Sequence, residues 1–257
     1  MNRSLLPTLE NSLLWQLPGY SRKVYFFNEL VSTMDTAFEL ARKNCADGTI
    51  IVANRQTKGR GRMTRVWHSD TGGLYFTIIL RPNLSVEHSG RIGFTASYCL
   101  ARTLRDDFGV DAKVKWPNDI LVDERKIAGI LSQIHVEDDN IAFLNIGIGL
   151  NVNNDPIKLV PQATSLISLL NRRISRKEIL SNFLKRLDQH LNDAAFLEKI
   201  IDYWKTLTVT LNRKVKIITS KKIYNGIAIN VNASGALIIE REDGMLQTIL
   251  YGDCFHQ

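Results

Sequence analysis

The sequence predicts an α+β protein in which helices cover a β-sheet and a small β-domain follows towards the C-terminus. Three patterns support this prediction. Apolar and β-branched runs lie between turn residues, as is typical of strands. Three segments place apolar residues at helical spacing, and short alternating runs begin near Val209. Because 257 residues exceed the usual size of one domain, we expect a large domain at 1–207 and a small one at 208–257.

The first part of the chain is predicted to combine strands with one helix. Ser32 or Thr33 can cap this helix, because a hydroxyl at the start of a helix accepts a backbone N–H. An apolar stripe at helical spacing follows, and Asp47-Gly48 marks the turn that ends the helix. The strands predicted here are 24–30, 49–53 and 74–80.

Two longer helices are predicted further along the chain. The first is expected to begin at Ser85 and to end at Gly109, with apolar residues at every fourth position between them. The second begins with the capping box 175–178. Both helices should pack on the sheet, and in the small domain 232–235 and 243–244 are expected to form hairpin turns. The remaining strands of the sheet are predicted at 114–116, 120–122, 127–136 and 141–150.

The composition is that of an ordinary folded chain, with 44% hydrophobic and 23% charged residues. The longest apolar stretches are shorter than the roughly 20 residues that span a bilayer, and no signal pattern opens the chain, so we expect a cytoplasmic protein without a membrane association. Cys45, Cys99 and Cys254 are scattered and lack a neighbouring histidine cluster, which predicts neither a disulfide framework nor a metal site. The net charge of +7 fits nucleic acid, an anionic substrate or an acidic protein equally well.

The segment 56–67, Q-T-K-G-R-G-R-M-T-R-V-W, concentrates positive charge around Gly59 and Gly61. Glycine allows a backbone to approach a ligand closely, and guanidinium groups match phosphate or carboxylate oxygens in pairs. The segment is therefore either a loop that grips a polyanion or a solvated basic turn. The segment alone does not decide between the two.

Further motifs, taken together in their order along the chain, favour the polyanion-binding loop over the solvated turn. The ordered set resembles the biotin protein ligases across nearly the whole sequence. It consists of Ser32-Thr33, G-R-G-R at 59–62, K-W-P-N-D at 115–119, R-K-I-A-G-I-L at 125–131 and I-G-I-G-L-N-V-N at 146–153.

The resemblance implies both a fold and a reaction. The fold is a class II synthetase-like catalytic domain of the biotin and lipoate ligase type, with a mixed sheet covered by helices, and a small C-terminal Src-homology-3-like β-barrel. The reaction is the ATP-dependent formation of biotinyl-5'-AMP, followed by transfer of biotin to a lysine of the biotin carboxyl carrier protein of acetyl-CoA carboxylase.

By the same resemblance, Lys126, Arg62 and Asp119 are the catalytic residues. Lys126 would place an ammonium on the carboxylate and α-phosphate oxygens. Asp119 would either help to deprotonate the incoming lysine or only position groups. The implied biotin contacts are Ser32, Thr33, Gln56, Gly59, Arg60, Lys126, Gly129, Gly147 and Gly149. The implied ATP and adenylate contacts are Arg60, Gly61, Arg62, Trp67, Asn118, Lys126 and Asn151.

The resemblance also implies the cofactors and partners. Mg²⁺ is expected to arrive with ATP, because no dedicated metal cage is visible in the sequence. The expected partner is the carrier domain, and the chain is either a monomer or a homodimer. Some members of the family carry an N-terminal winged-helix domain that binds DNA. Only 31 residues precede Ser32, so we expect neither that domain nor DNA binding.

Two positions depart from the pattern of the family. Met34 stands where asparagine is common, and Met63-Thr64 replaces the more usual arginine-glycine pair. Because threonine lacks the freedom of glycine at positive φ, we expect loop closure and adenylate release to differ at Thr64.

Two other functions compete with biotin ligation. A lipoate or octanoate ligase shares the catalytic fold and the adenylate chemistry, although the G-R-G-R and K-W-P-N-D motifs favour biotin. A nucleic-acid-binding module would explain the positive charge and the small barrel. Such a module is expected to carry stacking aromatic residues beside a basic face, and the sequence offers no evident platform of this kind.

Overall fold

The computed structural model describes residues 12–257, so the first eleven residues of the predicted catalytic domain lie outside the described part. The chain forms two compact units, each built from two separate segments. The first unit contains the residues up to Val86 and Glu124–Lys185, and the second contains Glu87–Asp123 and Arg186–Gln257. Each observed unit is discontinuous in sequence, whereas the prediction was two continuous domains that meet between residues 207 and 208. That boundary remains a prediction.

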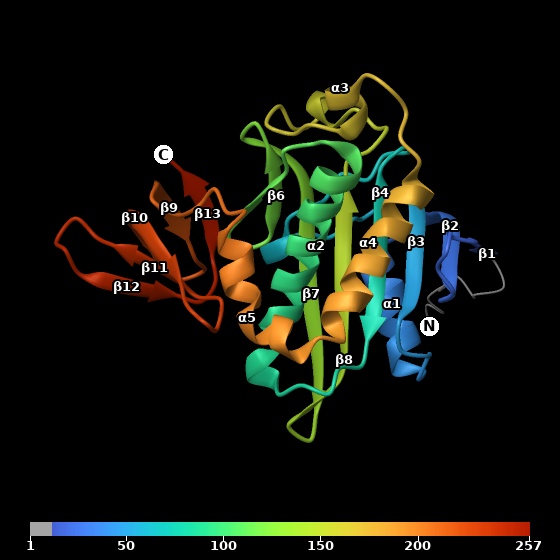
Figure 1. Cartoon of the computed structure of the whole chain (residues 1–257), viewed down its shortest axis with the longest axis horizontal. Helices are drawn as coiled ribbons and strands as arrows, with labels where there is room; N and C mark the ends of the chain where they lie inside the picture. Colours follow the sequence, from blue (N-terminus) through green and yellow to red (C-terminus); the bar gives the residue numbers. More distant parts are fainter. Residues whose placement is uncertain (1–11) are drawn as a thin grey trace, which may run out of the picture. The chain divides into compact units, whose positions relative to one another are not determined.

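A mixed β-sheet forms the first unit, as predicted (Figure 1). Its strands lie in the order β1-β2-β3-β4-β8-β7. β2 and β3 run parallel, and the other neighbouring pairs run antiparallel. The strands are β1 (Leu13–Leu14), β2 (Val24–Leu30), β3 (Thr49–Gln56), β4 (Leu74–Leu80), β7 (Arg125–Glu137) and β8 (Asn140–Leu150).

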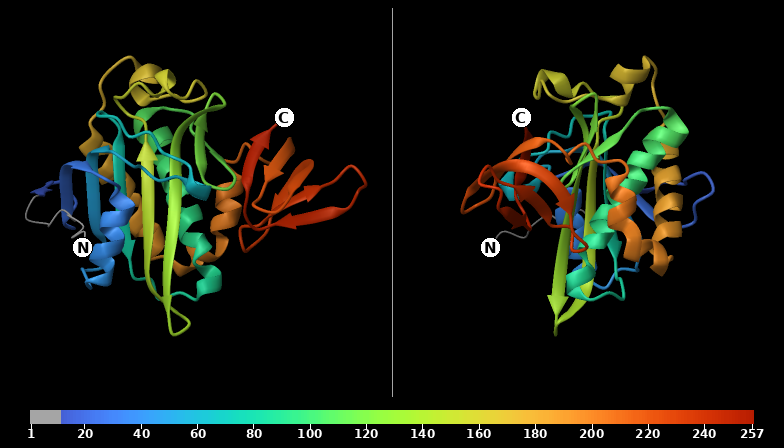
Figure 2. Two further views of the ribbon diagram at one scale, coloured as in Figure 1. Left: turned by 180° about the vertical axis from the view of Figure 1, so that it is seen from behind. Right: turned by 60° about the vertical axis from the view of Figure 1, so that its left-hand side comes forward.

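Helices cover both faces of this sheet (Figures 1 and 2). α1 (Thr33–Arg42) packs against β3, β4 and β8 on one face. α4 (Arg176–Leu191) crosses the opposite face, where Phe183 meets Phe76 of β4 edge to face with ring centroids 5.6 Å apart. Shorter helical segments are η2 (Arg62–Thr64), η4 (Pro156–Lys158) and α3 (Leu166–Leu170).

Side-chain hydroxyls begin both of these helices, as the sequence predicts. Ser32 is the N-cap of α1 and accepts the backbone N–H of Met34 at 3.2 Å. Ser175 accepts the backbone N–H of Glu178 at 3.3 Å at the start of α4. These bonds satisfy N–H groups that have no partner within a helix.

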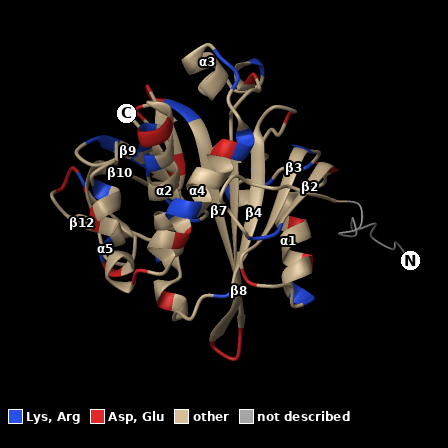
Figure 3. Ribbon diagram, turned by 45° about the vertical axis from the view of Figure 1, so that its right-hand side comes forward, with Lys and Arg blue, Asp and Glu red and all other residues tan. Residues whose placement is uncertain are grey.

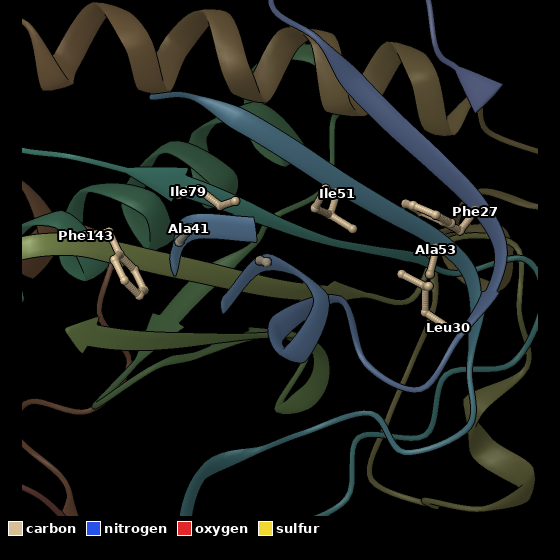
Figure 4. Packing of buried hydrophobic residues seen from close by; sticks show 8 residues of the cluster. Phe27, Leu30, Ala41, Ile51, Ala53, Ile79 and Phe143 are labelled. Carbon is tan, nitrogen blue, oxygen red and sulfur yellow. The ribbon is translucent and has the colours of Figure 1, made fainter. Parts of the chain in front are cut away.

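A hydrophobic cluster holds α1 on the sheet (Figure 4). Two buried alanines, Ala37 and Ala41, allow the helix backbone to approach the strands closely. The cluster consists of Phe27, Leu30, Ala37, Ala41, Ile51, Ala53, Ile79 and Phe143. This packing fixes the N-terminus of α1 at one position on the sheet face.

The second unit combines two long helices, a hairpin and an antiparallel sheet. The sheet has the strand order β12-β11-β10-β9-β13, which agrees with the predicted small C-terminal β-domain. The predicted hairpin turns at 232–235 and 243–244 join β10 to β11 and β11 to β12. The elements are η3 (Val86–His88), α2 (Gly90–Phe108), β5 (Lys113–Lys115), β6 (Asp119–Val122), α5 (Ala194–Lys205), β9 (Lys214–Ile218), β10 (Ile223–Val231), β11 (Leu237–Glu240), β12 (Leu246–Ile249) and β13 (Asp253–His256).

Three α-helices differ from the expectation, and one of them is α3, which was not predicted. α2 begins at Gly90 and not at Ser85, because the 3₁₀ turn η3 occupies the intervening residues. α5 was not predicted, although Asp193 caps it by accepting the backbone N–H of Phe196 at 3.0 Å. Within residues 12–257, no helix is both long enough and apolar enough to cross a membrane.

Candidate active site

The basic segment is an ordered hairpin in the first unit. The backbone N–H of Trp67 donates to the carbonyl of Gly59 at 2.9 Å, and that of Gly61 donates to the carbonyl of Arg65 at 2.7 Å. A side chain at Gly59 is excluded, because a Cβ there would lie 2.3 Å from the carbonyl oxygen of Trp67. The glycine therefore permits the close pairing of the two arms.

The tip of this hairpin adopts left-handed backbone geometry without glycine. Met63 has φ 49° and Thr64 has φ 64°. The left-handed region is unfavourable for a β-branched residue. The turn therefore has a backbone geometry that suits glycine, and the backbone of Thr64 is strained in it.

A chain of hydrogen bonds connects this hairpin to the sheet and to α1. Thr77 Oγ1 donates to Thr33 Oγ1 at 2.9 Å, and Thr33 donates through its backbone N–H and its hydroxyl to Gln56 Oε1 at 2.7 and 3.1 Å. Gln56 Nε2 then donates to Ser69 Oγ at 2.8 Å, and Ser69 donates to the carbonyl of Trp67 at 3.0 Å. We call these five residues the polar relay. It fixes Thr33 and Gln56, two of the residues implied for biotin, against each other.

An aromatic ring, a cation and bare backbone meet beside the relay. Gly129 of β7 and Gly149 of β8 are register partners, and the indole of Trp67 covers both. A Cβ at Gly149 would lie 2.4 Å from Trp67 Nε1, and one at Gly129 would lie 3.1 Å from the same ring. The Lys126 ammonium lies 5.2 Å from the ring centroid, within the range of a cation–π interaction. Trp67 Nε1 is buried and has no hydrogen-bond partner among the described residues.

The remaining glycine of the motif, Gly147, is covered by α1. A Cβ at Gly147 would lie 2.4 Å from the sulfur of Met34. Met34 thus occupies the space above Gly147 as Trp67 does above Gly149. The predicted approach of biotin to these two glycines therefore requires both side chains to shift, and that approach remains a prediction.

Backbone hydrogen bonds hold the start of β7, where Lys126 lies. The Lys126 N–H donates to the carbonyl of Gln162 at 2.8 Å, and its carbonyl accepts from Thr164 at 2.9 Å. Asn151 is tied to the same region, because its N–H donates to the carbonyl of Ile127 at 2.9 Å and its side-chain oxygen accepts from Asn154 at 2.9 Å. Hydrogen bonds therefore hold the backbones of Lys126 and Asn151 within the first unit.

Arg60 forms an ion pair that the sequence did not indicate. Its guanidinium lies 2.7 Å from Asp35 of α1, and the two side chains are 45% and 46% exposed. Exposed ion pairs contribute little to stability. An anionic ligand can therefore compete with Asp35 for Arg60. Arg62 lies half-buried in η2, next to Gly61.

Charge is distributed unevenly along the β7–β8 hairpin. Asp138 and Asp139 form an acidic turn at one end, which is red in Figure 3. Gly129 and Gly149 lie at the opposite end, beside Lys126. The end that carries the motif residues is therefore the end suited to an anion.

Asn118 and Asp119 belong to the second unit. Asp119 begins β6 and is the register partner of Lys115, and Asn118 lies in the turn before it. Trp116 is buried in the same unit, where its indole N–H donates to the carbonyl of Gly235 at 2.9 Å. Trp116 therefore has a structural role within that unit.

The structure brings most of the expected residues together in the first unit. Sequence reasoning missed Asp35, Ser69 and Thr77, which complete the polar contacts of that group. The one feature of the sequence that could have indicated Ser69 is its position two residues after the end of the basic segment. Within residues 12–257, no group of three or more His, Cys, Asp or Glu side chains is arranged to hold a metal ion.

Comparison with known proteins agrees with this geometry. Residues 27–153 match the biotin/lipoate A/B protein ligase family, and residues 210–257 match the biotin protein ligase C-terminal domain. The bifunctional ligase/repressor BirA of Bacillus subtilis (strain 168) is 33% identical over 229 residues, covering 86% of this chain and 70% of that protein. The chain belongs to the biotin protein ligase family.

Other relatives of this biotin protein ligase family member cover nearly its whole length. A biotin–[acetyl-CoA-carboxylase] ligase of Mycobacterium tuberculosis is 26% identical over 262 residues, which is 97% of this chain and 96% of that protein. The solved structure of a biotin protein ligase from Aquifex aeolicus in complex with biotin and ATP superposes with a TM-score of 0.78. It is 29% identical and covers 93% of this chain and 99% of that one. The predicted fold class is confirmed.

Proposed function

We propose that this biotin protein ligase family member forms biotinyl-5'-AMP from biotin and ATP and transfers the biotin to a lysine of the biotin carboxyl carrier protein of acetyl-CoA carboxylase. The observation that carries the proposal is the position of the Lys126 ammonium, which lies over the indole of Trp67 beside the bare backbone of Gly129 and Gly149. This arrangement offers a cation for an acid group and a flat ring for stacking, and a ligand reaches the strand backbone once the Trp67 indole shifts.

The polar relay suits the ring head of biotin. A ureido group has two N–H donors and one carbonyl acceptor. Thr33 and Gln56 present both donors and acceptors on one rigid network, and Ser32 caps α1 next to them. We assign the head of the acid to these residues, because a preorganised site loses little entropy when it binds.

The first reaction joins two anions. A carboxylate oxygen of biotin attacks the α-phosphorus of ATP, a P–O bond forms, and pyrophosphate leaves with the electron pair of the broken bond. Lys126 and Arg62 would offset the negative charge that builds on the phosphoryl oxygens. Bound Mg²⁺ supplies further neutralisation of the polyphosphate, and its ligands would be phosphate oxygens and water.

The second reaction is an acyl transfer. The amine of the carrier lysine attacks the acyl carbon of the adenylate, an amide bond forms, and AMP leaves. The attacking amine must lose a proton, and Asp119 is the residue assigned to accept a hydrogen bond or that proton. Asn118, Asn151, Gly61 and Arg60 complete the proposed contacts to the adenylate.

ATP–pyrophosphate exchange tests this proposal, with biotin, lipoate and octanoate compared in parallel. We expect exchange with biotin alone, and we expect biotinylation of a purified carrier domain to appear as a mass increase. Lys58→Ala is a matched control, since it removes an exposed cation from the same segment and should leave exchange unchanged. Exchange with lipoate or octanoate alone would assign the chain to those acids instead.

Repression is not part of the proposed function. The B. subtilis relative is named a ligase and repressor, and the match covers 70% of that protein. We do not assign its repressor activity to this chain. A mobility-shift assay with biotin-operon DNA at physiological salt, in the presence of biotin and ATP, tests this point. Sequence-specific retention of the DNA would add a second function.

A further inference from the structure

A buried amide on β8 has no hydrogen-bond partner within residues 12–257. Asn145 is completely buried, and neither its Oδ1 nor its Nδ2 forms a hydrogen bond with the described residues. Its register partner on β7 is Gln133, whose Oε1 is also buried and unpaired. Buried polar groups are almost always hydrogen-bonded in native proteins, so the unpaired Asn145 amide beside the unpaired Gln133 Oε1 indicates a missing partner.

These amides lie on the same sheet face as the candidate active site. Alternate residues of a strand share one face, which places Asn145 between Phe143 and Gly147. Phe143 packs against Phe38 of α1, and Gly147 lies under Met34 of the same helix. Asn145 is two residues from Gly147, which is roughly 7 Å along a strand.

The neighbours of Asn145 on β4 and α1 cannot pair with its amide. Its register partner on β4 is Ile79, a member of the hydrophobic cluster in Figure 4 together with Ala37 and Phe143. These neighbours are hydrocarbon and offer neither donors nor acceptors. These neighbours therefore leave the amide available to a ligand.

We propose that Asn145, together with Gln133, determines the specificity of the acid pocket by hydrogen bonding to the polar ring head of the substrate. This inference rests on the proposed function. The order along the β7–β8 hairpin is Lys126 with Gly149, then Gly147, then Asn145 with Gln133. An acid held by its carboxylate at Lys126 therefore directs its far end towards the two amides.

The chemistry of an amide favours a ureido head over an aliphatic one. The Asn145 side chain offers two donors and one acceptor, which match the carbonyl and the N–H groups of a ureido ring. An aliphatic or dithiolane end would leave the Asn145 amide and the Gln133 Oε1 unpaired, and unpaired buried groups are the strongest basis for rejecting a substrate. Met34 covers Gly147 and must shift for the head to enter, which its flexible side chain permits.

The test is Asn145→Leu, in which a hydrocarbon of similar size replaces the amide. We expect the KM for biotin in pyrophosphate exchange to rise at least about tenfold while kcat changes less than about twofold, because the lost bonds are remote from the reacting atoms. We expect the ligand-free melting temperature to stay the same or to rise, since an unpaired buried group is removed. Ile146→Val, on the opposite face of β8, is the matched control and should leave the KM unchanged.

The opposite pattern overturns the inference. An unchanged KM for biotin together with a lower melting temperature would assign the amide a structural partner, such as a buried water. If Asn145→Leu does not fold, Asn145→Ser takes its place and an unchanged KM again contradicts the inference.

The wild-type protein separates this inference from the proposed function. If it is stabilised by biotin without catalysing exchange, the proposed reaction fails, and the same variants are compared by their biotin-induced thermal shift. If biotin does not stabilise it at all, both proposals fail.

Discussion

Gln56 Oε1 accepts two hydrogen bonds from Thr33, one from its backbone N–H at 2.7 Å and one from its hydroxyl at 3.1 Å. Thr33 is the first residue of α1, and its N–H has no partner within the helix. Gln56 therefore acts as a second cap of α1 from a residue 23 positions away. Its amide nitrogen continues the relay to Ser69 at 2.8 Å, so one side chain connects the helix to the basic hairpin.

We predict that Gln56→Ala destabilises the protein and weakens biotin binding. The loss of a helix cap and a part-buried hydrogen bond should lower the free energy of unfolding by about 1–2 kcal/mol. Urea denaturation measures the stability, and the biotin-induced thermal shift measures the binding. Gln56→Glu is the matched control, because a carboxylate still accepts from Thr33 but cannot donate to Ser69. If both variants behave as the wild type, the relay has no energetic role.

The strained hairpin tip gives a second prediction. Thr64 has φ 64°, which costs an L-residue about 1–2 kcal/mol, whereas glycine adds about 0.4–1 kcal/mol of unfolded-state entropy. Thr64→Gly should therefore raise the free energy of unfolding by about 0.5–1 kcal/mol. We also expect faster release of biotinyl-5'-AMP, because the glycine tip is more flexible. Thr64→Asn, which tolerates positive φ while keeping a side chain, separates the two effects. Unchanged adenylate release in Thr64→Gly would contradict the expectation at this position.

Local signals in the sequence account for much of the fold. Ser32 and the capping box at Ser175 predicted the starts of α1 and α4, because a cap depends on residues only a few positions apart. α2 shows the limit of this reasoning. Ser85 is also a capping residue type, yet a 3₁₀ turn follows it and the helix starts at Gly90. Residue type alone did not distinguish these cases.

Contacts between distant residues account for what sequence reasoning could not reach. The pairing of Arg60 with Asp35 and the position of Trp67 over Gly149 depend on how the hairpin folds back on the sheet. The motifs implied that these residues belong to one site. They contained no information on which side chain covers which glycine, because that depends on packing between strands and α1.

Charge at the reacting centre gives a third prediction. Lys126→Ala and Arg62→Ala should each lower the single-turnover rate of adenylate formation by about 10²–10³-fold. Each variant lacks a cation that offsets the negative charge developing in the transition state. Rapid quenching with labelled ATP measures this rate directly. Lys126→Arg keeps the positive charge but changes the shape of the cationic group. Its rate is therefore expected to lie between those of the wild type and Lys126→Ala. Near-normal rates in both alanine variants would refute the assignments.

The last prediction concerns the pH dependence of stability in the second unit. The ring of His190 stacks on Phe196 with centroids 3.8 Å apart. Burial lowers the pKa of His190 below its usual value of 6.5, and the nearby Arg186 lowers it further, while Asp193 acts in the opposite direction. The folded state therefore disfavours the protonated ring. A group of this kind binds protons more readily in the unfolded state, so its contribution to stability is complete above pH 6.5 and is lost as the pH falls below that value.

We accordingly expect the melting temperature of the wild-type protein to fall between pH 8 and pH 5.5, and we expect His190→Gln to lose less over the same interval. Calorimetry or circular dichroism at the two pH values measures both. His135 is the matched control site, because it lies in the first unit, and His135→Gln should retain the full pH dependence that His190 causes. An identical pH dependence in wild type and His190→Gln would show that the stacked ring does not titrate in the way its surroundings require.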